Sequence, residues 1–179
     1  MKKLVMIALV AVSFVSRAQQ HVAQNGLYKS ADDFAAGRIS HEFDADSKEK
    51  IVKYPTFYKG ILIKSPGNSM KVDPSEYWGF RDNFKDYRFY KGDKYAVGKE
   101  EGFFIYEKTN TSTVQNEMYF SREASGPLYP LTIKDLREAF DDDNAVMTQI
   151  TAFQTKNNFN EIQQLSSLDV IHIMRTAAE

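Results

Sequence analysis

The part of the sequence richest in possible binding chemistry is the stretch Glu76–Tyr90, which reads EYWGFRDNFKDYRFY. It holds the only tryptophan of the chain, set among phenylalanines, tyrosines and basic residues. Flat aromatic faces with polar groups at their edges bind sugars, nucleic-acid bases or cations. The same composition also suits strands that pack one face into a hydrophobic core. The stretch is therefore either a ligand surface or a piece of buried sheet.

Strand alternation separates these two possibilities, because successive side chains of a strand point to opposite faces. It predicts that four of the rings face the core, namely Trp78, Phe80, Tyr87 and Phe89. It leaves four residues as the candidate ligand-binding set, namely Tyr77, Arg81, Arg88 and Tyr90. Tyr77 and Arg81 are expected on the face of their strand opposite Trp78 and Phe80.

The remaining chemically active side chains form no catalytic or metal-binding motif. The histidines are His21, His41 and His172, which are far apart in the sequence and fit no HExxH spacing. The run Asp141–Asn144 lacks the glycine and glutamate of an EF-hand loop, and we interpret it as a helix cap. The acid pairs Asp32–Asp33 and Glu100–Glu101 are interpreted as solvated turn residues rather than a glycosidase pair. The sequence predicts no catalytic residue, no metal site and no cofactor, and it favours a non-enzymatic protein.

The N-terminus has the layout of a secretory signal peptide. Lys2 and Lys3 precede the apolar run Leu4–Val15, and small residues follow up to Ala18. The run is shorter than the roughly 20 apolar residues that span a bilayer. We expect residues 1–18 to be a signal peptide cleaved after Ala18, residues 19–25 a loose leader, and residues 26–179 one domain. A membrane anchor that stays attached is the alternative.

Composition limits the partners of the mature chain. The whole chain has 23 basic and 24 acidic side chains; Lys2, Lys3 and Arg17 leave with the signal, so 20 remain against 24, a formal charge of −4. Such a chain lacks the positive field that attracts phosphate backbones, so nucleic acid is not expected as a partner. There is no cysteine, so packing alone must stabilise the exported protein. No membrane span is expected after signal removal, and the periplasm and the extracellular medium are both open as destinations.

The pattern of apolar and turn residues predicts a single α+β domain. A short helix is expected over 30–37, with Ser30 as its cap. Residues 39–121 alternate short apolar stretches with Gly, Asp and Asn turns, which indicates an antiparallel β-meander. The strands are expected at 39–43, 51–58, 60–64, 70–72, 77–81, 87–90, 94–97, 103–107 and 117–121.

Residues 132–175 switch to helical spacing and are expected to pack against the meander. Thr132–Asp135 is a capping box for a first helix, and Asp141–Asn144 caps a second. A third helical stretch starts at Ile162. Residues 169–174 fit either the continuation of that helix or a final strand.

Several short phrases, in a fixed order, resemble a group of small uncharacterised exported proteins of Gram-negative bacteria. They are GLYKSADDF from Gly26, EYWGFRD from Glu76, the YRFY and FFIYEK strands, GPLYPLTIKDLREAF and NNFNEI. The resemblance covers the chain from about Gly26 to Arg175. It implies export and a single domain, and it implies no activity or catalytic residues.

These observations predict an exported, non-enzymatic binding or interaction module of the cell envelope. Its partner would be a protein, a glycan or a small ligand. One alternative is an exported hydrolase acting on glycan or peptide through an unmarked acidic site, and another is a purely structural or stress-related envelope protein with no small ligand. Converging carboxylates in a deep pocket would indicate the hydrolase, and a shallow aromatic patch would indicate the binding module.

Overall fold

The computed structural model describes residues 25–43, 50–52, 61–65, 68–100, 102–110 and 115–178. The expected signal peptide and residues 19–24 of the expected leader lie outside these residues. The described chain is α+β, as predicted: an antiparallel meander packs against C-terminal helices, and a short helix lies near the N-terminus.

Eight strands form one antiparallel sheet in the order β11-β10-β9-β8-β7-β6-β1-β2. Their bounds are β1 Gly26–Tyr28, β2 His41–Glu42, β6 Gly79–Asp82, β7 Lys85–Tyr90, β8 Asp93–Glu100, β9 Phe103–Asn110, β10 Gln115–Ser121 and β11 Tyr129–Pro130. Three further strands, β3 Lys50–Val52, β4 Ile61–Ser65 and β5 Asn68–Val72, form a second, smaller sheet. The strands β1 and β11 were not predicted, because segments of two or three residues carry no alternation for a sequence to show.

The helix caps are those that the sequence indicates. Ser30 precedes α1 (Ala31–Ala35), and its hydroxyl accepts a hydrogen bond from the Asp33 N–H at 3.1 Å. Thr132 does the same for Asp135 at the start of α2 (Ile133–Ala139), also at 3.1 Å. Each cap satisfies a backbone donor that the first helical turn cannot pair.

The acid run caps α3 (Asn144–Asn157), because the carboxylate of Asp143 accepts from the N–H groups of Ala145 and Val146. The last helix, α4, spans Ser167–Ala178. The expected start at Ile162 was wrong, because Ile162 is exposed and the helix begins only after Ser166, whose hydroxyl accepts from the Asp169 N–H. Helix α4 settles residues 169–174 as helix, since Val170 and Ile173 are both buried, as the three-residue spacing of one helix face allows.

The large sheet has two different faces. One, the core face, carries Leu27, Phe80, Phe89, Ile105 and Phe120; the other, the tyrosine face, carries Tyr28, Arg88, Tyr95, Tyr106 and Tyr119. At one end of the core face, Leu27, Phe80 and Phe89 pack against Ile61, Ile63 and Val72 of the small sheet. At the other end, Phe103, Ile105 and Phe120 pack against α2, α3 and α4.

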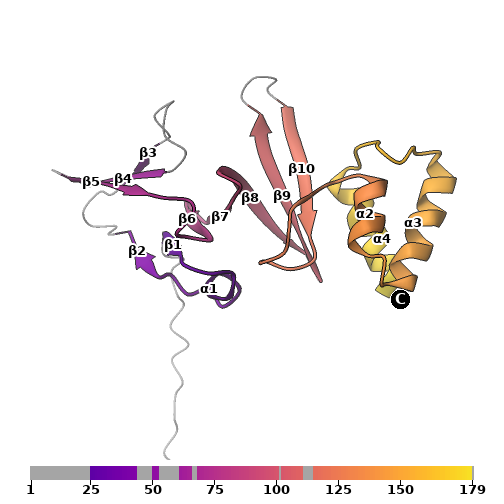
Figure 1. Cartoon of the computed structure of the whole chain (residues 1–179), viewed down its shortest axis with the longest axis horizontal. Helices are drawn as coiled ribbons and strands as arrows, with labels where there is room; N and C mark the ends of the chain where they lie inside the picture. The colour runs from indigo at the N-terminus through magenta and orange to yellow at the C-terminus, as the bar shows by residue number, and fades with distance from the viewer. Residues whose placement is uncertain are drawn as a thin grey trace, which may run out of the picture.

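Two sets of elements cover the core face, the small sheet and the three C-terminal helices, and these two covers lie at opposite ends of the molecule. In Figure 1 the small sheet lies at one end and the three C-terminal helices at the other, with β8, β9 and β10 between them. The hydrophobic core is therefore in two parts, and the middle of the core face lies between them.

Candidate functional site

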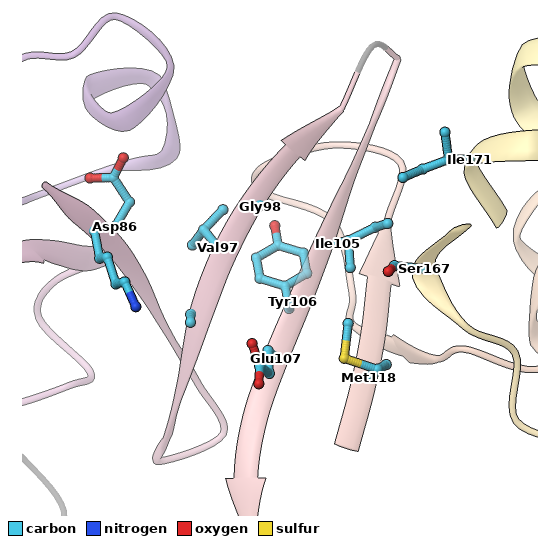
Figure 2. Close-up of a pocket in the computed structure, with 11 residues that line it drawn as sticks. Asp86, Val97, Gly98, Ile105, Tyr106, Glu107, Met118, Ser167 and Ile171 are labelled. Atoms are coloured by element: carbon cyan, nitrogen blue, oxygen red, sulfur yellow. The ribbon is translucent and has the colours of Figure 1, made fainter. Parts of the chain in front are cut away.

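A cavity of about 340 Å³ lies over the middle of the large sheet, and we call it the central groove. Strands β7 to β10 and helix α4 line it, through Lys85, Asp86, Ala96, Val97, Gly98, Ile105, Tyr106, Glu107, Met118, Ser167 and Ile171. Of these, Asp86, Val97 and Tyr106 belong to the tyrosine face by strand register, and the other strand residues belong to the core face. Figure 2 shows Ser167 and Ile171 reaching it from the helix side, Ile105 and Glu107 on the central strand, and Asp86 on the opposite side.

The groove exists because small residues occupy the middle of the core face. One cross-strand row runs Leu27, Phe80, Tyr87, Ala96, Glu107 and Met118 over six strands. Its large apolar members are near the two covers, and Ala96 lies between them. Gly98, two residues further along β8, has no side chain, and a Cβ built there would meet only the carbonyl oxygen of Ile105, at 3.5 Å. The sheet is therefore left open between its two covered ends.

The groove is mostly apolar, with charged groups at its edges. Ile105 is buried, and Met118 and Ile171 are half-buried beside the helical core. Lys85 is exposed and Glu107 is half-buried. Neither of these two side chains forms an ion pair with another described residue.

The β6–β7 turn directly precedes Lys85, which lines the groove, and it presents an exposed aromatic ring. Its two central residues, Asn83 and Phe84, have φ values of 47° and 64°, the left-handed region that bulky residues rarely adopt. The Phe84 side chain is 76% exposed. The next residue, Lys85, lines the groove.

The carboxylate of Asp86 is engaged within the protein. It accepts two hydrogen bonds from the Arg81 guanidinium, at 2.7 and 2.8 Å, and one from the Tyr28 hydroxyl at 2.8 Å. Tyr28 is fully buried. Burial, reinforced by the hydrogen bond to Asp86, raises the pKa of the Tyr28 hydroxyl far above its ordinary value, so this group stays a neutral donor.

Arg88, one of the four candidate ligand-binding residues, is only 4% exposed and acts as a clamp on the chain. It donates to the Gly126 carbonyl at 2.6 Å, to the Ser125 carbonyl at 3.5 Å and to the Tyr106 hydroxyl at 3.2 Å. Its guanidinium lies against the rings of Trp78, Tyr90 and Tyr106. No described carboxylate pairs with it; carbonyl oxygens and ring faces offset its charge.

The other three candidates do not join into one surface. Tyr90 lies beside Arg88 on the tyrosine face, and Arg81 is paired with Asp86. Tyr77 packs against the cluster around Phe80, on the core-face side, with the Lys29 ammonium 4.5 Å from its ring centre. The structure thus brings Arg88 and Tyr90 together and leaves Tyr77 apart from them.

The expected faces of Trp78 and Tyr77 were wrong. The Trp78 ring stacks on Phe34 at 4.2 Å and donates a hydrogen bond to the Ala124 carbonyl at 2.8 Å, away from the cluster of Phe80. The physical reason is that β6 begins at Gly79, so both residues precede the strand and the alternation does not govern them. The shared face of Phe80, Tyr87 and Phe89 is confirmed, and Phe80 stacks on Tyr87 at 4.8 Å.

Sequence reasoning missed the central groove. Its floor lies in β8, β9 and β10, which overlap predicted strands, but the sequence pattern does not single out Ala96, Gly98 or Glu107. The one available signal was the pair of small residues two positions apart in β8, which leaves a gap on one face of a strand. The contribution of α4 could not be found from the sequence, because it depends on how the helices dock on β9 and β10.

The fold and the groove define an α+β protein with an open, mostly apolar groove on its sheet. Within the described residues, no group of three or more acidic or histidine side chains is placed to hold a metal ion. No described helix is long and apolar enough to cross a membrane. Comparison of the chain with protein-family models, with curated proteins and with solved structures finds no match.

Proposed function

We propose that the protein is an exported, non-enzymatic interaction module that binds a protein partner in the central groove. The observation that carries the proposal is the groove itself: an apolar strip of core face left open between two covered ends. Sites that bind ligands are typically concave and mostly apolar, with a few polar groups that orient the ligand.

The size and lining of the groove favour an apolar side chain of a protein over a glycan. At about 340 Å³ it is near the lower end of the roughly 300–1,000 Å³ range of small-molecule sites. Ala96, Ile105 and Met118 offer side chains that cannot hydrogen-bond the hydroxyls of a sugar. Buried sugar hydroxyls without partners would weaken binding. An aromatic or aliphatic side chain meets no such penalty.

The charged edge adds a preference for a basic residue beside the apolar anchor. Glu107 is half-buried on the groove floor and has no described cationic partner. A lysine or arginine next to the anchoring side chain would supply one. Charge pairs of this kind contribute orientation and specificity to an interface.

A peptide titration followed by methyl NMR tests the binding site. The probe is acetyl-Gly-Phe-Lys-amide at millimolar concentration, and the matched control is acetyl-Gly-Ser-Lys-amide. We expect the phenylalanine peptide to shift the methyl signals of Ile105, Met118 and Ile171 and to leave that of Ile61, in the other core cluster, unchanged.

A variant that fills the groove completes this test. In Gly98→Leu the new side chain has room over the sheet, because the nearest atom to its Cβ is at an ordinary contact distance. The variant should fold and lose the peptide-induced shifts. Shifts that persist in the folded variant, or a monomeric wild-type protein whose groove methyls do not respond to the peptide, would contradict the proposal.

Export is the second part of the proposal, and the layout of residues 1–18 supports it. When the full chain is expressed in a Gram-negative bacterium, the mature protein should be released with the periplasmic fraction or the medium. Mass spectrometry should place its N-terminus at Gln19. A full-length chain that stays in the cytoplasm would refute this part.

A further inference from the structure

We propose that the partner in the central groove is a second copy of this chain, whose Phe84 enters the groove while the first copy's Phe84 enters in return. This inference rests on the proposed function, since it names the occupant of the same groove. Three observations carry it: the unusual residue at the turn, the charge that follows it, and the place of the turn beside the groove.

Phe84 occupies a position that favours glycine. Positive φ at both central residues defines a type I′ hairpin turn, in which Asn-Gly is the preferred pair. Here Asn83 is followed by a phenylalanine with φ of 64°, and its ring is 76% exposed. The ring gains little from burial within its own chain, and its backbone is strained. Strain of this kind persists at positions that serve a function.

The residue after Phe84 provides charge complementarity to the groove. Lys85 is exposed, Glu107 is half-buried in the groove, and neither has an ion-pair partner among the described residues. A turn that delivers Phe84 onto the apolar floor beside Ile105 and Met118 carries Lys85 with it. The Lys85 ammonium of one copy would then meet the Glu107 carboxylate of the other.

The position of the turn allows a reciprocal contact. Lys85 lines the groove at the edge of β7, so the turn and the groove belong to one continuous surface. A two-fold axis through such a surface places each turn over the other copy's groove. This is the isologous arrangement of symmetric dimers, in which one patch is both donor and acceptor of the contact.

Sedimentation velocity of the mature chain over a concentration series tests the inference. The wild type should show a monomer–dimer equilibrium. Phe84→Asn removes the ring and keeps a residue that tolerates the left-handed backbone, so it should fold with at least wild-type thermal stability and associate at least about tenfold more weakly. The matched control is Ile162→Asn, since Ile162 is 78% exposed and does not line the groove. The control should associate as the wild type does.

A charge exchange tests the predicted contact between copies. Lys85→Glu and Glu107→Lys should each weaken dimerisation, because each places like charges together. The double variant restores an opposite pair between copies and should recover most of the association. A double variant that associates no better than the weaker single variant would overturn the inference, and so would a Phe84→Asn variant that dimerises like the wild type.

The two proposals fail in different ways. If the wild type stays monomeric at every concentration while acetyl-Gly-Phe-Lys-amide still shifts the groove methyls, the second-copy inference is wrong and the proposed function stands. If the peptide shifts nothing and the wild type is monomeric, both are wrong. If Gly98→Leu abolishes peptide binding and dimerisation together, the same groove serves both.

Discussion

Replacing Arg88 with methionine distinguishes a structural clamp from a ligand-binding arginine. Methionine keeps much of the length and apolar volume of the side chain and removes its donors and charge. If Arg88 served a ligand, as its position in the aromatic stretch first indicated, Arg88→Met would leave stability nearly unchanged and reduce binding. The structure predicts the opposite, because the side chain is buried and both of its terminal nitrogens donate hydrogen bonds within the chain.

The expected loss follows from the contacts. Hydrogen bonds from charged groups contribute about 1.5–3 kcal/mol each. The bonds to the Gly126 carbonyl at 2.6 Å and the Tyr106 hydroxyl at 3.2 Å qualify, and that to Ser125 at 3.5 Å is too long to add much. These values are already net of desolvation, and the buried Nε of Arg88 has no hydrogen-bond partner, so the loss is expected at the lower end of their sum. Tyr106 keeps its contact with Ser121 at 3.1 Å. We expect a net loss of about 3 kcal/mol.

The single tryptophan makes this loss easy to follow. The Trp78 indole donates to the Ala124 carbonyl in the same segment that Arg88 holds. Urea unfolding monitored by tryptophan emission and by circular dichroism should therefore show a lower midpoint for Arg88→Met. The control is Arg38→Met, whose side chain is 63% exposed and pairs with Asp33 at the surface; exposed ion pairs contribute little to stability, so its loss should be small. A loss for Arg88→Met no larger than that of the control would refute the clamp.

Three further predictions concern the turns, the sheet and pH. Gly79→Ala should lower the free energy of unfolding by about 1–3 kcal/mol, because the new Cβ would lie 2.0 Å from the Tyr87 carbonyl oxygen. Gly98→Ala should be neutral or slightly stabilising, because its Cβ meets no close atom. Urea titrations measure both changes, and equal effects would count against the sheet register. Phe84→Gly should raise the thermal midpoint, with a gain of about 1 kcal/mol, and a lower midpoint would show that the turn is not strained. The Ser30 hydroxyl, aided by Arg38, holds the pKa of the Asp33 carboxyl below its ordinary 3.8. The stabilising effect of this carboxylate is therefore present above pH 3.8 and is lost as the pH falls through the folded-state pKa. An NMR titration midpoint for Asp33 at or above 3.8 would contradict this.

Local patterns were sufficient to predict the elements that depend on neighbours in the sequence. Ser30 and Thr132 cap helices because a hydroxyl reaches the N–H three residues on. The α+β class followed from two patterns along the chain: short apolar stretches separated by turn residues over 39–121, and apolar residues at helical spacing over 132–175. In each case the determining contact spans only a few residues.

Predictions failed where a contact between distant residues decided the outcome. Trp78 was assigned by alternation, but it lies before the strand and its ring is held by Phe34 and Ala124, both more than forty positions away. The strand pattern allows Arg88 as a ligand residue, because it does not reveal the loop of Ser125 and Gly126 whose carbonyls accept its hydrogen bonds.

The sequence by itself determined most of the strands, where α1, α2 and α3 begin, and that an α+β chain results. The tertiary structure alone decided what the aromatic stretch Glu76–Tyr90 does: one face packs against the small sheet, Arg88 clamps a loop, and Phe84 remains exposed. It also decided that Ala96 and Gly98 lie under open space between two covers. The reason is physical: propensities and caps act within a few residues, whereas a groove is the space left after distant elements have packed, and no single segment carries that information.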